Sequence, residues 1–148
     1  MVCCHHYYYA LRDGGDSAFS IDASSVTFGR GAIRELGDNA RALGLNRVAL
    51  FTDKVVRKLP LVGDALASLK AAGVDTVVYD DVKVEPTDQS FLAAAKFARE
   101  GNFDGYVSVG GGSVIDTCKA ANLYATHPAD FIAYVNAPVG ERRAVPGP

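Results

Sequence analysis

Three consecutive glycines, Gly110, Gly111 and Gly112, form the stretch of this chain whose residue types are best suited to binding an anion. They follow the apolar-rich run 105–109, and a sequence with helical character begins at Ser113. Glycine permits positive φ and a close approach of the backbone to a ligand, because it has no Cβ. A helix N-terminus adds unpaired N–H groups and the positive end of the helix dipole. The stretch therefore predicts a strand, a tight turn and a helix whose start can hold phosphate.

The same residues also allow a purely structural interpretation. Ser113 and Asp116 have the spacing of a Ser-x-x-acid capping box, so the stretch could be a well-capped turn and nothing more. It matches no Gly-x-Gly-x-x-Gly fingerprint, and Lys119 lies too far along the chain for a Walker loop. The glycine run alone leaves both interpretations open.

Asp53 is the second residue whose position suggests chemistry. It follows the run 47–52, whose continuous apolar residues are typical of a strand buried on both faces of a parallel sheet. Ligands of open α/β sheets bind outside the carboxyl ends of the strands, where both Asp53 and the glycines are expected. A carboxylate there can accept hydrogen bonds from ribose hydroxyls while the glycine turn holds the linked phosphates. The pairing predicts nucleotide binding, although Asp53 precedes Gly110 by 57 residues, unlike the usual acidic residue about 20 positions after the glycines.

The elements that must position these residues alternate along the chain. Strands are expected at 47–52, 75–79 and 106–109, with the first two of the buried type, and two short strands at 19–21 and 26–28. Helices are expected at 31–43, 60–72, 87–100 and 113–125, the third with the apolar face Phe91, Leu92, Ala95 and Ala98, and a short helical piece at 130–135. This alternation predicts an α/β fold with an open parallel sheet, a Rossmann-like nucleotide-binding domain.

Composition limits the classes of partner. The chain has 148 residues, enough for one domain, and 49% of them are apolar. Fifteen basic and 17 acidic residues give a formal charge of −2 without a basic run, which argues against nucleic acid. No apolar run approaches the roughly 18 residues of a membrane span, and the N-terminus lacks a secretory signal. We therefore expect no membrane partner and a cytoplasmic location.

Several other reactive side chains have plainer interpretations. Cys3, Cys4, His5 and His6 are adjacent potential metal ligands without the spacing of a metal site, and we expect residues 1–17 to form a disordered tail. Cys118 is expected to be a core thiol, Lys119 a solvated lysine and His127 a surface histidine. The segment 85–87 remains open between a cap and turn and the lining of a cofactor cleft.

Three segments in this order resemble the iron-containing (group III) alcohol dehydrogenases in their N-terminal part: FTDK at 51–54, VEPT at 84–87 and VGGGSVIDTCK at 109–119. Within that family, the run 116–141 is most similar to the hydroxyacid-oxoacid transhydrogenases. The resemblance implies that NAD binds in a cleft between an α/β domain and a helical domain that holds a divalent metal, iron or zinc. It also implies oxidation of 4-hydroxybutyrate to succinic semialdehyde, coupled to reduction of 2-oxoglutarate to 2-hydroxyglutarate.

The resemblance assigns roles to individual residues. Asp53 would hold the adenosine ribose, the glycine turn (Gly110, Gly111 and Gly112) with Ser113 the pyrophosphate, and Asp116 would lie near the nicotinamide. The family's Thr-rich segment and metal ligands belong to sequence beyond position 148. We therefore expect residues 18–148 to be an NAD-binding domain without catalytic or metal-binding residues of its own, inactive alone.

Two alternatives stay open within and beyond the family. A dehydrogenase of the lactaldehyde or propanediol type is the nearest competitor, and a non-catalytic nucleotide-binding module is the candidate from another class. The resemblance further implies a possible homo-oligomer in the full-length form, and a mitochondrial location if the protein comes from an animal.

Overall fold

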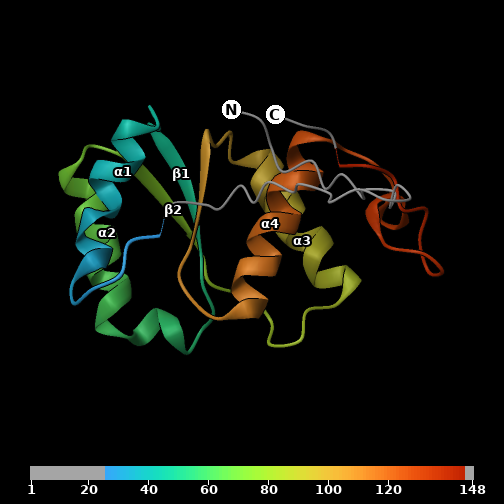
Figure 1. The fold of residues 1–148 in the computed structure, drawn as a ribbon, viewed down its shortest axis with the longest axis horizontal. Helices are drawn as coiled ribbons and strands as arrows, with labels where there is room; N and C mark the ends of the chain where they lie inside the picture. The colour runs from blue at the N-terminus through green and yellow to red at the C-terminus, as the bar shows by residue number, and fades with distance from the viewer. Residues whose placement is uncertain (1–25, 146–148) are drawn as a thin grey trace, which may run out of the picture.

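The computed structural model describes residues 26–145, and they form a sheet with helices on both faces. The strands β1 (Arg47–Phe51), β2 (Asp75–Tyr79) and β3 (Gly105–Ser108) are parallel and lie in the order β2-β1-β3. Figure 1 shows α1 (Leu36–Ala42) and α2 (Pro60–Ala71) on one side of the sheet, and α3 (Asp88–Glu100) and α4 (Gly112–Thr126) on the other. The predicted α/β fold with an open parallel sheet is confirmed.

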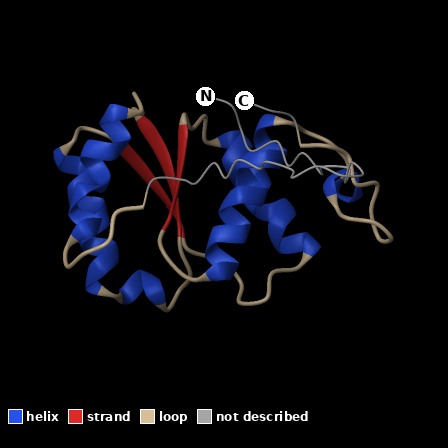
Figure 2. Ribbon diagram, in the orientation of Figure 1, coloured by secondary structure: helices blue, strands red, loops and turns tan. Residues whose placement is uncertain are grey.

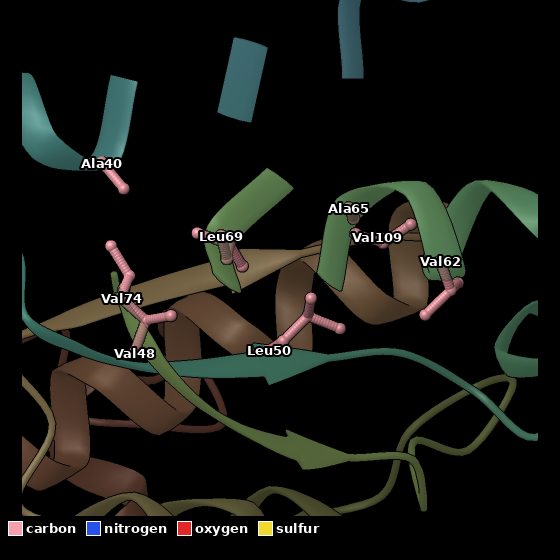
Figure 3. Packing of buried hydrophobic residues seen from close by; sticks show 8 residues of the cluster. All are labelled: Ala40, Val48, Leu50, Val62, Ala65, Leu69, Val74 and Val109. Atoms are coloured by element: carbon pink, nitrogen blue, oxygen red, sulfur yellow. The ribbon is translucent and has the colours of Figure 1, made fainter. Parts of the chain in front are cut away.

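The central strand β1 is buried on both faces, as its continuous apolar run predicted. Val48 and Leu50 pack with residues of α1 and α2, including Val62 of α2 (Figure 3). Ala49 and Phe51 point to the other face and pack against α3 and α4. Four successive side chains, Val48–Phe51, are fully buried. The strand therefore lies between two separate cores, one on each face of the sheet. Figure 2 shows the strands between two groups of helices.

The second strand was wrongly predicted as buried. β2 pairs only with β1 and forms an edge of the described sheet. Its side chains are half-buried or exposed, Val77 and Val78 among them, because no strand of the described part covers its outer edge. Apolar composition alone does not distinguish a central from an edge strand.

The helices begin and end close to the predicted positions. Short 3₁₀ segments, Ala32–Glu35 and Val56–Lys58, precede α1 and α2, and Pro60 opens α2. Thr87 caps α3, as the sequence indicated, and the structure adds a reciprocal capping box with Ser90. A further 3₁₀ segment, Phe131–Tyr134, matches the short helical piece expected at 130–135.

The buried face of α3 differs from the predicted one. Ala95 and Ala98 are buried as expected, and Phe91 is half-buried. Leu92, predicted to be in the core, is exposed, and Ala94 is buried in its place. The small side chains of Ala94, Ala95 and Ala98 let α3 pack closely against α4, and this turns Leu92 toward solvent.

Near the N-terminus, the prediction of a strand at 26–28 is wrong. Val26 and Phe28 have no regular structure, and the Phe28 side chain is 100% exposed. An alternating pattern forms a strand only where a partner strand is available, and the described sheet pairs three other segments. The strand predicted at 19–21, the tail at 1–17 and the Cys3–His6 cluster lie outside the described residues.

Candidate functional site

The carboxyl edge of the sheet brings Asp53 and the glycine turn to neighbouring positions. In the β1–β3 register Phe51 faces Ser108, so Asp53 and Gly110 each lie two residues beyond this pair. One further hydrogen bond continues the ladder, from Val109 N to Phe51 O at 2.9 Å. In Figure 1 the turn after β1 and the start of α4 both lie at the lower edge of the sheet. The predicted juxtaposition is confirmed.

The start of α4 presents backbone N–H groups without partners. Gly111 is the residue that precedes the helix, and its carbonyl accepts from Val114 N at 3.0 Å and Ile115 N at 3.1 Å. No side chain caps this end. The N–H groups of Gly112 and Ser113 therefore have no acceptor among residues 26–145, which suits them to an anion.

The capping box of Ser113 and Asp116, one of the two interpretations that the sequence left open, does not form. The helix begins at Gly112, so Ser113 lies inside the first turn and not at the capping position. Its Oγ accepts a hydrogen bond from Glu85 N at 3.4 Å instead of bonding a helix N–H. Asp116 is exposed in the following turn. Ser113 is thus in contact with the segment 85–87, which the sequence left open between two interpretations.

The three glycines are required for different reasons. A Cβ on Gly110 would lie 2.5 Å from Val114 Cγ2, so packing against α4 excludes any side chain there. A Cβ on Gly111 or Gly112 would meet nothing within 4 Å. None of the three has positive φ. The absence of side chains on Gly111 and Gly112 leaves the backbone at the helix start open to approach.

Asp53 has one carboxylate oxygen engaged locally and one available. Its Oδ1 accepts from Val55 N at 2.8 Å and from Val56 N at 2.9 Å, which fixes the turn that follows β1. Its Oδ2 has no hydrogen-bond partner within the described part of the chain. The side chain is half-buried, so Oδ2 can accept hydroxyl groups of a ribose while Oδ1 holds the turn.

An ion-pair cluster joins the turn after β1 to the segment after β2. Lys54 Nζ and Lys83 Nζ each lie 2.9 Å from Asp81 Oδ1. The hydrogen bonds from Lys83 and Lys54 lower the pKa of Asp81 to about 2, and Asp81 raises the pKa of Lys54. All three side chains are exposed, so the cluster contributes little to stability.

Thr52 is a feature of this edge that sequence reasoning missed. The residue is fully buried directly before Asp53, and within residues 26–145 its Oγ1 has no hydrogen-bond partner. A buried hydroxyl without a partner costs about 1–3 kcal/mol. Threonine is a common strand residue, so no pattern in the sequence distinguishes this hydroxyl from one that is bonded.

We expect Thr52→Val to raise the free energy of unfolding by about 1 kcal/mol, because valine has a similar shape and no hydroxyl to desolvate. Thr117→Val is the matched control, since Thr117 is also buried but its Oγ1 donates to Ser113 O at 2.7 Å. That change should leave stability unchanged or lower it. Urea unfolding of both variants checks the expectation, and a Thr52→Val variant less stable than the parent would contradict it.

The remaining reactive side chains lie apart from the site. Burial raises the pKa of the Cys118 thiol to about 11, which confirms the core cysteine and makes it a poor nucleophile. Lys119 is exposed as expected, and His127 ends α4. Within residues 26–145, no group of three or more His, Cys, Asp or Glu side chains is arranged to hold a metal ion.

The sequence profile of iron-containing alcohol dehydrogenases matches residues 23–147, which is most of the chain. The chain belongs to this family. It is 45% identical to the mitochondrial hydroxyacid-oxoacid transhydrogenase of Mus musculus over 97% of its length, and 48% identical to that of Homo sapiens over 90%. It spans 32% and 29% of these relatives, about a third of their length.

Solved structures show the same family likeness. An NADH-dependent butanol dehydrogenase from Thermotoga maritima aligns with a TM-score of 0.72 and 26% identity, over 78% of this chain and 29% of that one. A 1,3-propanediol oxidoreductase aligns with a TM-score of 0.67 and 33% identity, over 71% and 28%. In the described residues of this family member, no helix is long and apolar enough to cross a membrane.

Proposed function

We propose that this family member binds NAD(H) at the carboxyl edge of its sheet. The observation that carries the proposal is the open space in front of Gly111 and Gly112, at a helix start with free N–H groups. The unpaired Oδ2 of Asp53 lies at the neighbouring strand end. Family membership supports a nicotinamide nucleotide over other phosphate ligands.

In this proposal each residue has a distinct role. Asp53 Oδ2 accepts the hydroxyls of the adenosine ribose, while Oδ1 keeps the turn in place. The N–H groups of Gly112 and Ser113 donate to the pyrophosphate, Gly111 leaves the space that it occupies, and Gly110 lets the turn pack on Val114. Asp116, exposed one turn along α4, faces the nicotinamide half. The bound nicotinamide supplies hydride acceptance and donation.

For the complete protein we propose hydroxyacid-oxoacid transhydrogenase activity. A hydride and a proton leave 4-hydroxybutyrate, giving succinic semialdehyde, and are added to 2-oxoglutarate, giving 2-hydroxyglutarate. The identity of 45–48% to proteins with this name supports it. An alcohol dehydrogenase of the propanediol type is the second candidate, favoured by the structural likeness to 1,3-propanediol oxidoreductase. A non-catalytic nucleotide-binding module is the third.

Further proposals follow from the family. Residues 18–148 form one NAD-binding domain, and an iron or zinc ion and the catalytic groups lie in another part of the full-length protein. The described residues offer no cluster of side chains for such a metal. The relatives' names place them in mitochondria. A cytoplasmic location, mitochondrial for an animal protein, and a homo-oligomeric full-length form stay predictions.

Calorimetric titration of the 148-residue chain with NADH tests the binding proposal. We expect saturable binding, with competition by ADP-ribose; folded chain without any NADH binding would overturn it. The activity proposal is tested on the complete protein, by 4-hydroxybutyrate-dependent reduction of 2-oxoglutarate. Turnover of 1,3-propanediol with added NAD but no transhydrogenation would favour the second candidate, and NADH binding without either activity would favour the third.

A further inference from the structure

Glu85 has a backbone conformation that its residue type disfavours. Its φ is 57°, in the left-handed region, and only two other non-glycine residues of the described part, Asn102 and Arg142, share this feature. Glutamate lacks the short polar side chain that lets asparagine adopt this region. Glu85 also precedes Pro86, and a residue before proline favours extended backbone. Such a conformation persists only where the surroundings hold it.

Contacts on both sides hold Glu85 in place. Its N–H donates to Ser113 Oγ in the first turn of α4, at 3.4 Å. Two residues later, Thr87 N donates to Ser90 Oγ at 2.8 Å, which anchors the segment to the start of α3. The segment 85–87 therefore connects the N-termini of two helices, at the same edge of the sheet as Asp53.

The bond from Glu85 determines what the Ser113 hydroxyl can do. A serine hydroxyl has one proton to donate and two lone pairs to accept with. Because Glu85 N–H occupies one lone pair, the proton of Ser113 Oγ points away from that N–H, and no described residue accepts it. Thr117 in the same helix differs, because its hydroxyl proton is already donated within the protein, to the carbonyl of Ser113 at 2.7 Å.

We propose that Glu85 is a positioning residue, whose left-handed backbone holds the Ser113 hydroxyl so that it donates its proton to the pyrophosphate of NAD(H). The inference rests on the proposed NAD(H) site and adds a residue to it. The backbone N–H of Glu85 makes the hydrogen bond to Ser113 Oγ, and the Glu85 carboxylate takes no part in it. Substitution of Glu85 by a residue that adopts positive φ should therefore preserve the affinity for the ligand, whatever the charge of the new side chain.

A set of variants of the 148-residue chain tests this. We expect Glu85→Gly and Glu85→Asn to bind ADP-ribose within about twofold of the parent, since both tolerate positive φ. Glu85→Val and Ser113→Ala should each weaken ADP-ribose binding about five- to tenfold, the effect of one hydrogen bond. The double variant should be no weaker than either single variant, because both remove the same bond. Binding of adenosine, which has no pyrophosphate, should not change in any variant; NMR titration measures both ligands.

The outcomes separate this inference from the proposed function. A parent chain that binds neither NADH nor ADP-ribose overturns both. A loss of ADP-ribose affinity in Ser113→Ala but not in Glu85→Val overturns the role of Glu85 alone. Equal losses for adenosine and ADP-ribose would indicate general damage to the site and also overturn it. If Glu85→Val does not fold, Glu85→Ala takes its place. Alanine has the smallest side chain that still disfavours positive φ.

Discussion

Gly111→Val is expected to weaken NADH binding by about a hundredfold or more, close to 2.7 kcal/mol of binding free energy. The isopropyl group would fill the space in front of the N–H groups of Gly112 and Ser113, where the pyrophosphate lies in our proposal. The fold should tolerate the change, because a Cβ at Gly111 meets nothing within 4 Å. Its φ of −85° and ψ of −167° also suit any residue. NADH titration and urea unfolding of the same variant measure the two effects.

Gly110→Ala is the matched control for this variant. A Cβ at Gly110 would lie 2.5 Å from Val114 Cγ2, so the substitution should lower the free energy of unfolding by about 1–3 kcal/mol. Substitution of Gly111 should thus lower NADH affinity, whereas substitution of its neighbour Gly110 should lower the stability of the fold. Full NADH affinity in Gly111→Val would show that the phosphates do not lie in front of this helix.

Asp53→Asn is the second change with a large expected effect. The amide keeps an oxygen to accept from Val55 N and Val56 N, so the turn after β1 stays in place. It replaces the free carboxylate oxygen with an NH₂ group, which cannot accept ribose hydroxyls. We expect NADH binding to weaken about tenfold to a hundredfold, because hydrogen bonds to a charged group are lost.

Asp53→Ala distinguishes the two roles of this carboxylate. It should weaken NADH binding to a similar extent and also destabilise the fold by about 1 kcal/mol, because two backbone N–H groups lose their acceptor. Calorimetry and thermal unfolding of both variants provide the comparison. An Asp53→Asn variant with parental affinity for NADH would remove Asp53 from the site and leave it only the local role.

The parts of this molecule that follow from local pattern were predictable. The buried strand β1, the start of α2 at Pro60 and the cap at Thr87 each depend on residues close in sequence. The meeting of Asp53 with the glycine turn followed from one general rule about parallel sheets. Family resemblance added the proposal that the nucleotide is NAD(H), which no spacing in the chain specifies.

What the sequence did not predict depends on partners distant in the chain. The exposure of β2 depends on its place in the strand order, and that of Leu92 on how α3 lies against α4. A capping box at Ser113 stayed open as an interpretation because the actual partner of its hydroxyl, Glu85, lies 28 residues away. The unpaired hydroxyl of Thr52 appears only once its neighbours are placed.

The position of β1 between two strands that do not touch one another has a consequence for the lifetime of the site. Asp53 follows the central strand and Gly110 follows β3, so the pairing of β1 with β3 holds the starts of the two turns beside one another. That pairing is covered by both cores, and its opening requires a large part of global unfolding. The distance between the two halves of the site should therefore persist through the fast fluctuations that open surface loops.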